Sequence, residues 1–268
     1  MKKIILITGA TDGIGLETAK SLASKGHQIL IHGRSEKKLE HVSQLLTDLE
    51  VKDTESYIAD FSVMSDVVAL SQAILKKHTH LDVIINNAGI FKTENTITPD
   101  NLDIRFAVNT LAPFLLTKQL LPVLTETSRV VNLSSAAQAP VNIDALLGKT
   151  NLPAMDAYAQ SKLAITMWSR VMGLQSLNNT TLPKVIAVNP GSLLASKMVK
   201  EGFGVAGNDL SIGVDILIRA SLSGDFDDAS GKYFDNDSGR FSAPHPDALD
   251  DRKTEAVLKA IEQLLENY

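Results

Sequence analysis

The amino-acid sequence predicts a single domain built on a doubly wound, parallel α/β sheet. Short aliphatic runs alternate with longer segments of helical period along the 268 residues, which is the pattern of βαβ units. The aliphatic runs are continuous, as expected when helices cover both faces of the sheet. No repeat, low-complexity tract or Pro/Gly/Ser linker divides the chain, so we expect one domain over residues 1–268.

Each expected element follows from this alternation. The expected strands are Lys3–Thr8, Gln28–His32, Glu55–Ile58, Val83–Asn86, Arg129–Leu133, Lys184–Asn189 and Gly231–Phe234. The expected helices are Ile14–Lys25, Ser35–Leu49, Ser62–Lys77, Asn101–Leu121, Tyr158–Leu177, Ile212–Ser223 and Thr254–Glu266. Ligands of such folds bind at the carboxyl ends of the strands, so the residues that follow each strand are the informative ones.

Composition excludes several classes of function. The chain has 26 Lys+Arg against 31 Asp+Glu, a net charge of −5, and therefore lacks the basic footprint of a nucleic-acid or anionic-membrane binder. With no cysteine it has no disulfide, thiol nucleophile or cysteine-ligated metal. Its apolar runs are far shorter than the roughly 18 residues of a membrane span, and the N-terminal run reaches a Thr-Gly turn too soon for a signal peptide. We expect a cytoplasmic protein that does not bind membranes.

A glycine-rich turn follows the first expected strand and precedes a helix. Glycines allow a tight turn and close approach to an anion, and a helix N-terminus offers N–H groups and a positive dipole end. The alternative is a purely structural turn, but the position after an N-terminal strand favours a pyrophosphate site. The candidate contacts are Thr8, Gly9, Thr11, Asp12, Gly13, Ile14 and Gly15.

The end of the second expected strand indicates which dinucleotide is preferred. Folds that bind NAD place an Asp or Glu about 20 residues beyond the glycines, on the ribose 2′-hydroxyl. No carboxylate occurs between Glu17 and Glu36; Arg34 and Ser35 stand there instead. A guanidinium suits a 2′-phosphate, so we expect NADP(H), with NAD(H) less favoured. A solvated Arg34 is the alternative, and the charge of Asp12 near the same phosphate weakens the argument.

Two further strand ends offer cofactor contacts. Asp60 could accept a hydrogen bond from an adenine amino group or N-cap the next helix, with Ser62 as a competing cap. The two roles are compatible, and we expect both. Phe61 lies beside Asp60. The fourth strand ends at Asn86 and is followed by Asn87, Ala88 and Gly89. The small residues would let a cofactor lie against the backbone, and the Asn side chains can hold neighbouring main chains together.

Catalytic side chains are expected at the same edge of the sheet. Tyr158 and Lys162 are four residues apart and so share one helix face, where a cation favours phenolate and lowers the pKa of the tyrosine. Such a phenol is a usable general acid/base. The fifth strand brings the hydroxyl of Ser135 to this edge, while Ser134 points the other way if the strand persists. Asn109 lies in the helix expected to cross beneath.

Together these motifs resemble the short-chain dehydrogenase/reductase family, from Lys3 to about Phe234. The resemblance implies a Rossmann fold and an alcohol–carbonyl oxidoreductase. Tyr158 would pass a proton to the carbonyl oxygen, Ser135 would hydrogen-bond that oxygen, and Lys162 would hold the nicotinamide ribose and lower the Tyr158 pKa. Asn109 would hold a water that links Lys162 to solvent. Pro190, Gly191 and Ser192 follow the sixth strand and would pack beside the nicotinamide. Ser192 stands where the family often has Thr.

The segment before Tyr158 is longer than in most of the family. It holds 22 residues, 136–157, and the stretch Gln138–Asp156 resembles the longer loop of the retinol-dehydrogenase-like branch. Asp100–Leu102, Phe106–Asn109 and Pro113–Thr117 resemble the same branch. This chain shows no anchor segment of the kind that holds the membrane-bound members, so the resemblance implies a soluble relative and does not identify the substrate.

Residues 193–213 follow the Pro-Gly motif and form a candidate lid over a small, apolar carbonyl or alcohol substrate; the alternative is an ordinary surface loop. The expected pocket residues are Leu193, Leu194, Met198, Phe203, Ile90, Phe91 and Ala137. The stretch Asp235–Gly239 mimics the start of a calcium loop, but Pro246 stands where a bidentate Glu is needed, so we expect a surface turn and no metal site.

Two questions stay open at this point. A non-catalytic regulator could bind the same dinucleotide on the same fold, although it would not need the full set of Asn109, Ser135, Tyr158 and Lys162. A homo-oligomer is also open, because this family commonly pairs helices into dimers and tetramers.

Overall fold

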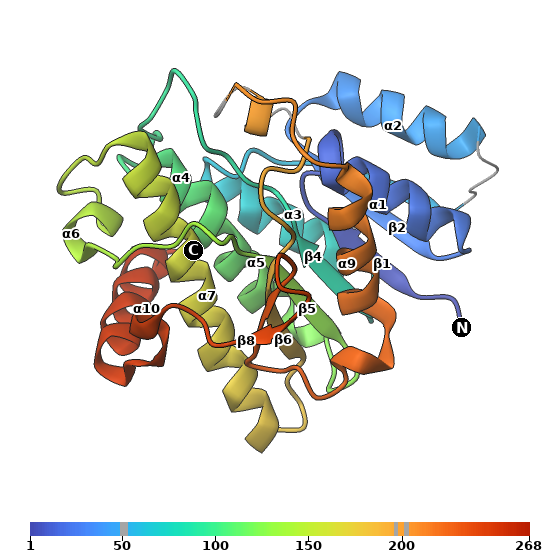
Figure 1. Ribbon diagram of the computed structural model, residues 1–268. Helices are drawn as coiled ribbons and strands as arrows, with labels where there is room; N and C mark the ends of the chain where they lie inside the picture. Colours follow the sequence, from blue (N-terminus) through green and yellow to red (C-terminus); the bar gives the residue numbers. More distant parts are fainter. Residues whose placement is uncertain (49–52, 196–197, 201–203) are drawn as a thin grey trace.

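The computed structural model describes residues 1–48, 53–195, 198–200 and 204–268. Within this part of the chain one eight-stranded sheet has the order β3-β2-β1-β4-β5-β6-β7-β8 (Figure 1). All neighbouring strands are parallel except β7 and β8. The strands are β1 (Ile4–Ile7), β2 (Gln28–Gly33), β3 (Thr54–Ile58), β4 (Val83–Asn86), β5 (Arg129–Leu133), β6 (Lys184–Asn189), β7 (Tyr233–Asp235) and β8 (Arg240–Ser242).

Helices cover both faces of this sheet, which confirms the expected doubly wound α/β fold. The α-helices are α1 (Gly13–Ser24), α2 (Glu36–Asp48), α3 (Met64–Lys77), α4 (Ile104–Phe106), α5 (Ala112–Leu120), α6 (Ile143–Leu146), α7 (Ala154–Asn178), α9 (Leu210–Leu222) and α10 (Asp251–Leu265). The core on one face is built with α1, α2 and α9, and the core on the other with α3, α5 and α7. Among the described residues no helix is both long enough and apolar enough to pass through a bilayer.

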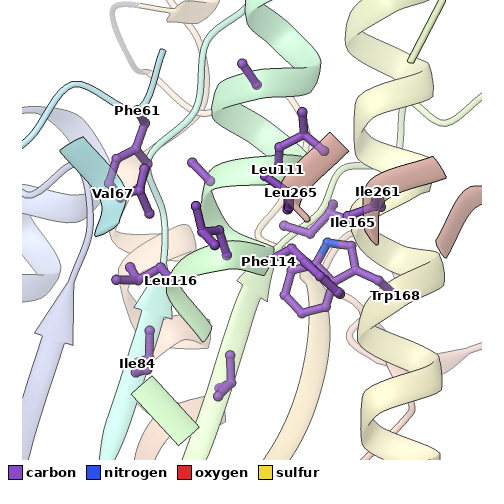
Figure 2. Packing of buried hydrophobic residues seen from close by; sticks show 14 of the residues in the cluster. Phe61, Val67, Ile84, Leu111, Phe114, Leu116, Ile165, Trp168, Ile261 and Leu265 are labelled. Carbon is purple, nitrogen blue, oxygen red and sulfur yellow. The ribbon is translucent and has the colours of Figure 1, made fainter. Parts of the chain in front are cut away.

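Successive residues of the strands supply these two cores. In β1 the side chain of Leu6 belongs to the core under α3, α5 and α7, while its neighbours Ile5 and Ile7 belong to the other. The C-terminal helix α10 adds a further layer to the first core. Its Ile261 lies near Trp168 of α7, against which Phe114 packs edge-on at 5.5 Å (Figure 2).

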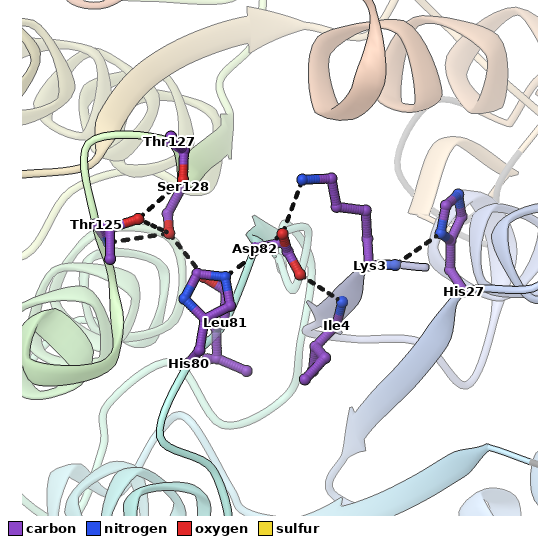
Figure 3. A network of polar contacts seen from close by, with 9 residues as sticks. All are labelled: Lys3, Ile4, His27, His80, Leu81, Asp82, Thr125, Thr127 and Ser128. Carbon is purple, nitrogen blue, oxygen red and sulfur yellow. Dashed lines mark hydrogen bonds and ion pairs between the residues drawn. The ribbon is translucent and has the colours of Figure 1, made fainter. Parts of the chain in front are cut away.

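The amino ends of the central strands are fastened by a polar network around Asp82 (Figure 3). Its carboxylate accepts hydrogen bonds of 2.8 Å from the Lys3 ammonium and from the Ile4 amide, and His80 lies 3.4 Å away. Burial alone would raise the pKa of Asp82, but the hydrogen bonds from Lys3 and Ile4 hold it below its usual value. This network lies at the amino ends of β1 and β4, at the edge of the sheet opposite the predicted site.

The expected elements are largely confirmed, and the larger differences lie at four places. The segment 101–121 is not one helix: Asn101 has a left-handed backbone (φ 59°), Asp103 caps the short α4, and Ala107–Leu111 form a π-helical turn before α5. The long helix α7 begins at Ala154, directly after Pro153, rather than at Tyr158. The short antiparallel β8 and helix α6 were not expected from the sequence. The predicted end of the second helix at residue 49 lies outside the described residues.

Candidate active site

The glycine-rich turn connects β1 to the N-terminus of α1. Gly9 and Gly13 have φ values of 66° and 55°, in the left-handed region that favours glycine. Asp12 N-caps α1: its Oδ1 accepts a 2.8 Å hydrogen bond from the Gly13 amide. The turn therefore places amide donors and the positive end of a twelve-residue helix at the carboxyl edge of the sheet.

The turn is locked against the Asn87–Gly89 segment at the end of β4. The Asn87 amide nitrogen Nδ2 donates to the carbonyl oxygens of Thr8 at 2.9 Å and Gly9 at 3.0 Å. A Cβ added at Gly15 would lie 2.3 Å from that Nδ2, and one added at Gly9 would lie 2.8 Å from the Cα of Ala88. The expected holding role of the Asn87 side chain is confirmed, and the two glycines are needed for this close packing.

A buried histidine that the sequence did not single out joins this turn to the end of β3. The Gly9 amide donates to His32 Nδ1 at 3.3 Å, and the opposite ring nitrogen, Nε2, lies 3.0 Å from the Ala59 carbonyl oxygen and donates to it. Phe61 stacks on the His32 ring at 4.1 Å. Burial lowers the pKa of His32 to about 4, so the ring is neutral. A histidine inside an aliphatic strand was the available sequence signal.

Arg34 follows β2 directly and is exposed beside the glycine turn. Ser35 comes next and its Oγ accepts a 3.5 Å hydrogen bond from the Lys38 amide. The Lys38 ammonium lies 3.7 Å from Asp12 Oδ2, so the charge of Asp12 is partly balanced. Gly33 allows close contact with Thr11, because a Cβ there would lie 2.5 Å from Thr11 Cγ2.

Asp60 caps a turn rather than the following helix. Its Oδ1 accepts hydrogen bonds from the Ser62 amide at 2.9 Å and the Ser62 hydroxyl at 2.8 Å. Helix α3 begins at Met64, and its N-cap position is Val63, which makes no side-chain cap. The expected N-cap role of Asp60 is therefore wrong, because a turn closed by Val63 N and Asp60 O (2.9 Å) intervenes.

Ser135 and Tyr158 meet at the end of β5. The Tyr158 hydroxyl is hydrogen-bonded to the Ser135 side chain, and the Phe91 ring packs 5.1 Å from the tyrosine ring. Ser135 Oγ also accepts a 3.1 Å hydrogen bond from the Ala137 amide. Ser134 is buried on the other side, with its Oγ 2.6 Å from Thr166 Oγ1. The expected opposite orientation of the two serines is confirmed.

Lys162 is buried one helical turn beyond Tyr158. Its ammonium donates to the Leu133 carbonyl oxygen at 2.7 Å and lies 5.8 Å from the centre of the Tyr158 ring. Burial lowers the pKa of Lys162 to about 8. Burial also raises the pKa of Tyr158, and the hydrogen bond from Ser135 offsets only part of this. The sequence predicted a lowered pKa for this phenol, and that prediction is wrong: the pKa of Tyr158 is raised, because burial disfavours the phenolate.

Asn109 lies in the π-helical turn, a feature often found at functional sites. Its Oδ1 accepts from the Ile90 amide at 2.8 Å, and its Nδ2 donates to the Ile90 carbonyl and to Ser161 Oγ, both at 3.0 Å. A Cβ added at Gly89 would lie 3.4 Å from Asn109 Oδ1 and 3.7 Å from Lys162 Nζ. The structure thus brings Asn109, Gly89 and Lys162 together.

The loop after β6 carries the last expected cofactor residues. Gly191 has φ 123°, its amide donates to Asn189 Oδ1 at 3.3 Å, and Ser192 is exposed. Of the expected lid, Leu194 is buried and the Leu193 carbonyl accepts a 2.7 Å hydrogen bond from the Asn208 amide. Phe203 and residues 196–197 and 201–202 lie outside the described residues.

Met198 reaches the centre of the site from this segment. Its Cε lies 3.7 Å from a Cβ placed on Gly89. Phe91 is buried next to Tyr158, while Ile90 and Ala137 are partly exposed near Asn109 and Ser135. Apolar side chains therefore lie close to the Ser135–Tyr158 pair.

Comparison with known proteins points to one family. The family model described as "short chain dehydrogenase" matches residues 3–203. Retinol dehydrogenase 12 of Mus musculus is 32% identical, over 87% of this chain and 77% of that protein. Human polyprenol dehydrogenase is 34% identical, over 62% of this chain and 53% of that protein.

Solved structures with a similar fold were also found. An uncharacterized protein from Mycobacterium paratuberculosis has a TM-score of 0.80 at 25% identity, covering 98% of this chain and 93% of its own. A chain from Escherichia coli CFT073 complexed with NADPH has a TM-score of 0.68 at 27% identity, covering 87% of this chain and 96% of its own.

Proposed function

Because this chain belongs to the short-chain dehydrogenase family, and so is an oxidoreductase acting on CH–OH groups, we propose that it interconverts an alcohol and a ketone or aldehyde with NADP(H). Tyr158 acts as general acid/base. The observation that carries this proposal is the hydrogen-bonded pair Ser135–Tyr158 with the buried Lys162 nearby, at the sheet edge that also holds the glycine turn.

The residues present fit the dinucleotide. The close-packed Gly9 and Gly15 leave no side chain between the backbone of the turn and a pyrophosphate. Asp60 and the Asn87–Gly89 segment would line the adenosine part, and Pro190–Ser192 would lie beside the nicotinamide. When bound, NADP(H) supplies or takes up the hydride. Asp60 keeps its second carboxylate oxygen for a ligand, since the Ser62 hydrogen bonds both use Oδ1.

The remaining chemistry is proton transfer by residues of this chain. Ser135 Oγ accepts from the Ala137 amide, which leaves the serine proton for the substrate oxygen or for Tyr158. In reduction, Tyr158 donates its phenolic proton to the substrate oxygen while Ser135 stabilises the developing negative charge. Burial raises the pKa of Tyr158 and so favours the protonated phenol, which is the form that reduction needs. The Lys162 ammonium lies close enough to stabilise phenolate when the proton leaves.

The preference for NADP(H) rests on Arg34 and its neighbours. Arg34 and Lys38 are cations at the carboxyl end of β2, where an NAD-selective fold has a carboxylate. The Lys38 ammonium forms an ion pair with Asp12 Oδ2 at 3.7 Å, so the exposed Arg34 is the principal candidate to bind the 2′-phosphate. A planar guanidinium can bind a phosphate with two hydrogen bonds.

The substrate is proposed to be a small apolar molecule. Phe91 packs against the Tyr158 ring, Met198 lies beside Gly89, and the apolar residues Ile90 and Ala137 neighbour Phe91 and Ser135 along the chain. Two relatives are named as dehydrogenases of retinol and of polyprenol, which supports an alcohol as the substrate class. We place the protein in the cytoplasm, in keeping with its acidic composition and absence of cysteine.

Binding and turnover of the purified protein test the proposal. NADPH and NADH affinities are measured by fluorescence titration for wild type and Arg34→Ala, and NADPH oxidation is followed with a panel of apolar ketones and aldehydes. Arg34→Ala is expected to weaken NADPH roughly 10- to 100-fold, the loss of a charge-assisted contact, and to leave NADH nearly unchanged. Equal losses would contradict the 2′-phosphate assignment. NADPH binding without turnover on any compound would favour a non-catalytic regulator.

A further inference from the structure

The carbonyl oxygen of Ser135 is held by two side chains rather than by the sheet. β5 ends at Leu133, whose partner in the ladder is Val188 of β6, so Ser135 lies outside the strand pairing. Its carbonyl oxygen accepts a hydrogen bond from the Tyr233 hydroxyl at 3.2 Å and from Gln138 Nε2 at 2.9 Å. These two donors therefore take the place that a neighbouring strand has in the middle of the sheet.

Tyr233 reaches Ser135 from a strand that is not adjacent to β5. It lies at the start of β7, and β6 separates the two strands. The register places Tyr233 opposite Ala187, which in turn lies opposite Asn132 of β5, so the three side chains form one row on the same face of the sheet. Because Ala187 is small, the Tyr233 ring can pass over β6 and bring its hydroxyl to the end of β5.

The surroundings of Tyr233 keep its hydroxyl a donor. Burial raises the pKa of Tyr233, and the negative charges of Asp235 and Asp237 raise it further, so the phenol keeps its proton. A second hydrogen bond joins Tyr233 to the Gln138 side chain. The two donors on the Ser135 carbonyl therefore also hold each other.

Ser135 connects this carbonyl to the proposed proton donor. Its Oγ accepts a 3.1 Å hydrogen bond from the Ala137 amide and is hydrogen-bonded to the Tyr158 hydroxyl. Because the carbonyl and the Oγ belong to one residue, a rotation of the Ser135 backbone moves the Oγ away from both partners. O–H···O hydrogen bonds span a range of only about 0.5 Å in length, so a small rotation is enough to weaken them.

We propose that Tyr233 is a positioning residue: its hydroxyl holds the Ser135 carbonyl and so fixes the Ser135 side chain where it meets Tyr158 and the substrate oxygen. This inference rests on the proposed function. Tyr233 acts through Ser135 and leaves the binding of NADP(H) unchanged. Tyr233→Phe removes only the hydroxyl, so it releases one of the two donors from the carbonyl while the ring stays packed.

Amide hydrogen exchange of Ala137 reports the position of Ser135 without any turnover, because this amide donates to Ser135 Oγ. In Tyr233→Phe we expect it to exchange about 5- to 10-fold faster than in wild type, the fold-change of one lost hydrogen bond. Tyr57→Phe is the control and should exchange as wild type does. Tyr57 is 6% exposed against 7% for Tyr233, and its hydroxyl donates to Glu55 at 2.8 Å on β3, with three strands between β3 and β5. Equal Ala137 exchange in wild type and Tyr233→Phe would overturn the proposal.

Single-turnover reduction measures the consequence for catalysis. With NADPH bound and the carbonyl substrate saturating, Tyr233→Phe should oxidise NADPH about 5- to 10-fold more slowly, while its Kd for NADPH stays within about 2-fold of wild type. Tyr57→Phe should match wild type in both quantities. A wild-type rate in Tyr233→Phe, or an NADPH affinity that falls as much as the rate, would contradict a role in positioning Ser135.

Two further variants test whether Tyr233 acts through Ser135. In a Ser135→Ala background, Tyr233→Phe should lower the rate no further, whereas independent effects would multiply; a further fall would refute the proposal. Gln138→Met removes the other donor to the same carbonyl and should reproduce both effects of Tyr233→Phe. This variant keeps the test decisive if Tyr233→Phe folds poorly, and wild-type exchange and rate in Gln138→Met would contradict control through the carbonyl.

Failure of the proposed function would look different. A wild-type protein that binds NADPH but reduces no carbonyl compound would remove the proposed function and the catalytic part of this inference, and Ala137 exchange would still decide whether Tyr233 holds Ser135. Turnover by wild type, with Tyr233→Phe equal to it in exchange and rate, would remove the inference alone.

Discussion

His32 should make the stability of the protein depend steeply on pH between neutrality and pH 4.5. Its pKa is about 4 in the folded protein, because burial disfavours the charged ring, against 6.5 for an unburied histidine. The unfolded chain therefore takes up the proton first, and stability falls as the pH drops from 6.5 toward 4. The difference between 6.5 and about 4 corresponds to about 3 kcal/mol of unfolding free energy in full, of which about 2 kcal/mol is lost by pH 5.

Urea unfolding at pH 7, 6, 5 and 4.5 measures this loss. Wild type is compared with His32→Gln, whose amide can still donate to the Ala59 carbonyl and accept from the Gly9 amide but does not titrate. The free energy of unfolding of wild type should fall about 2 kcal/mol more than that of His32→Gln between pH 7 and 5. His41→Gln, at an exposed position of α2, is the control and should follow the wild-type slope. Parallel curves for wild type and His32→Gln would refute the reasoning.

Two other perturbations follow from the structure. Gly15→Ala should reduce NADPH affinity at least 10-fold, since its Cβ would lie 2.3 Å from Asn87 Nδ2 and displace the turn. Gly224→Ala is the control and should leave NADPH affinity unchanged, because the nearest neighbour of its Cβ would be 3.6 Å away. Equal NADPH affinities of the two variants would contradict this packing. Asp82→Asn should lower the free energy of unfolding by about 1–2 kcal/mol at pH 7. Because the pKa of Asp82 is lowered, its contribution should vanish as the pH falls below its usual 3.8, which urea unfolding at pH 7 and 3 would detect.

The strands of the sheet could be predicted closely from the sequence. Three of them, Val83–Asn86, Arg129–Leu133 and Lys184–Asn189, have the predicted bounds, because continuous aliphatic runs between polar residues leave little freedom for a strand covered on both faces. Helix bounds were less certain. The start of α7 depends on Pro153, a residue well suited to precede a helix, and the break at Asn101 depends on one left-handed residue.

The candidate site, like the fold, could be predicted from the sequence only in part. The order of motifs after successive strands was enough to bring Ser135 and Tyr158 together, because parallel strands end at one edge. The contacts of His32 could not be predicted, since they join residues 23 and 27 positions apart whose pairing depends on the completed fold. The direction of the Tyr158 pKa was also missed, because burial is a property of the tertiary structure.

The most direct test of the account is single-turnover reduction of the best carbonyl substrate by NADPH-loaded wild type and Tyr158→Phe. The substitution removes only the phenolic oxygen, so NADPH affinity should stay within about 2-fold while the rate of NADPH oxidation falls about 100- to 10,000-fold, the usual effect of losing a general acid. A Tyr158→Phe protein that binds NADPH normally and reduces the substrate at the wild-type rate would contradict the assignment of Tyr158 as proton donor.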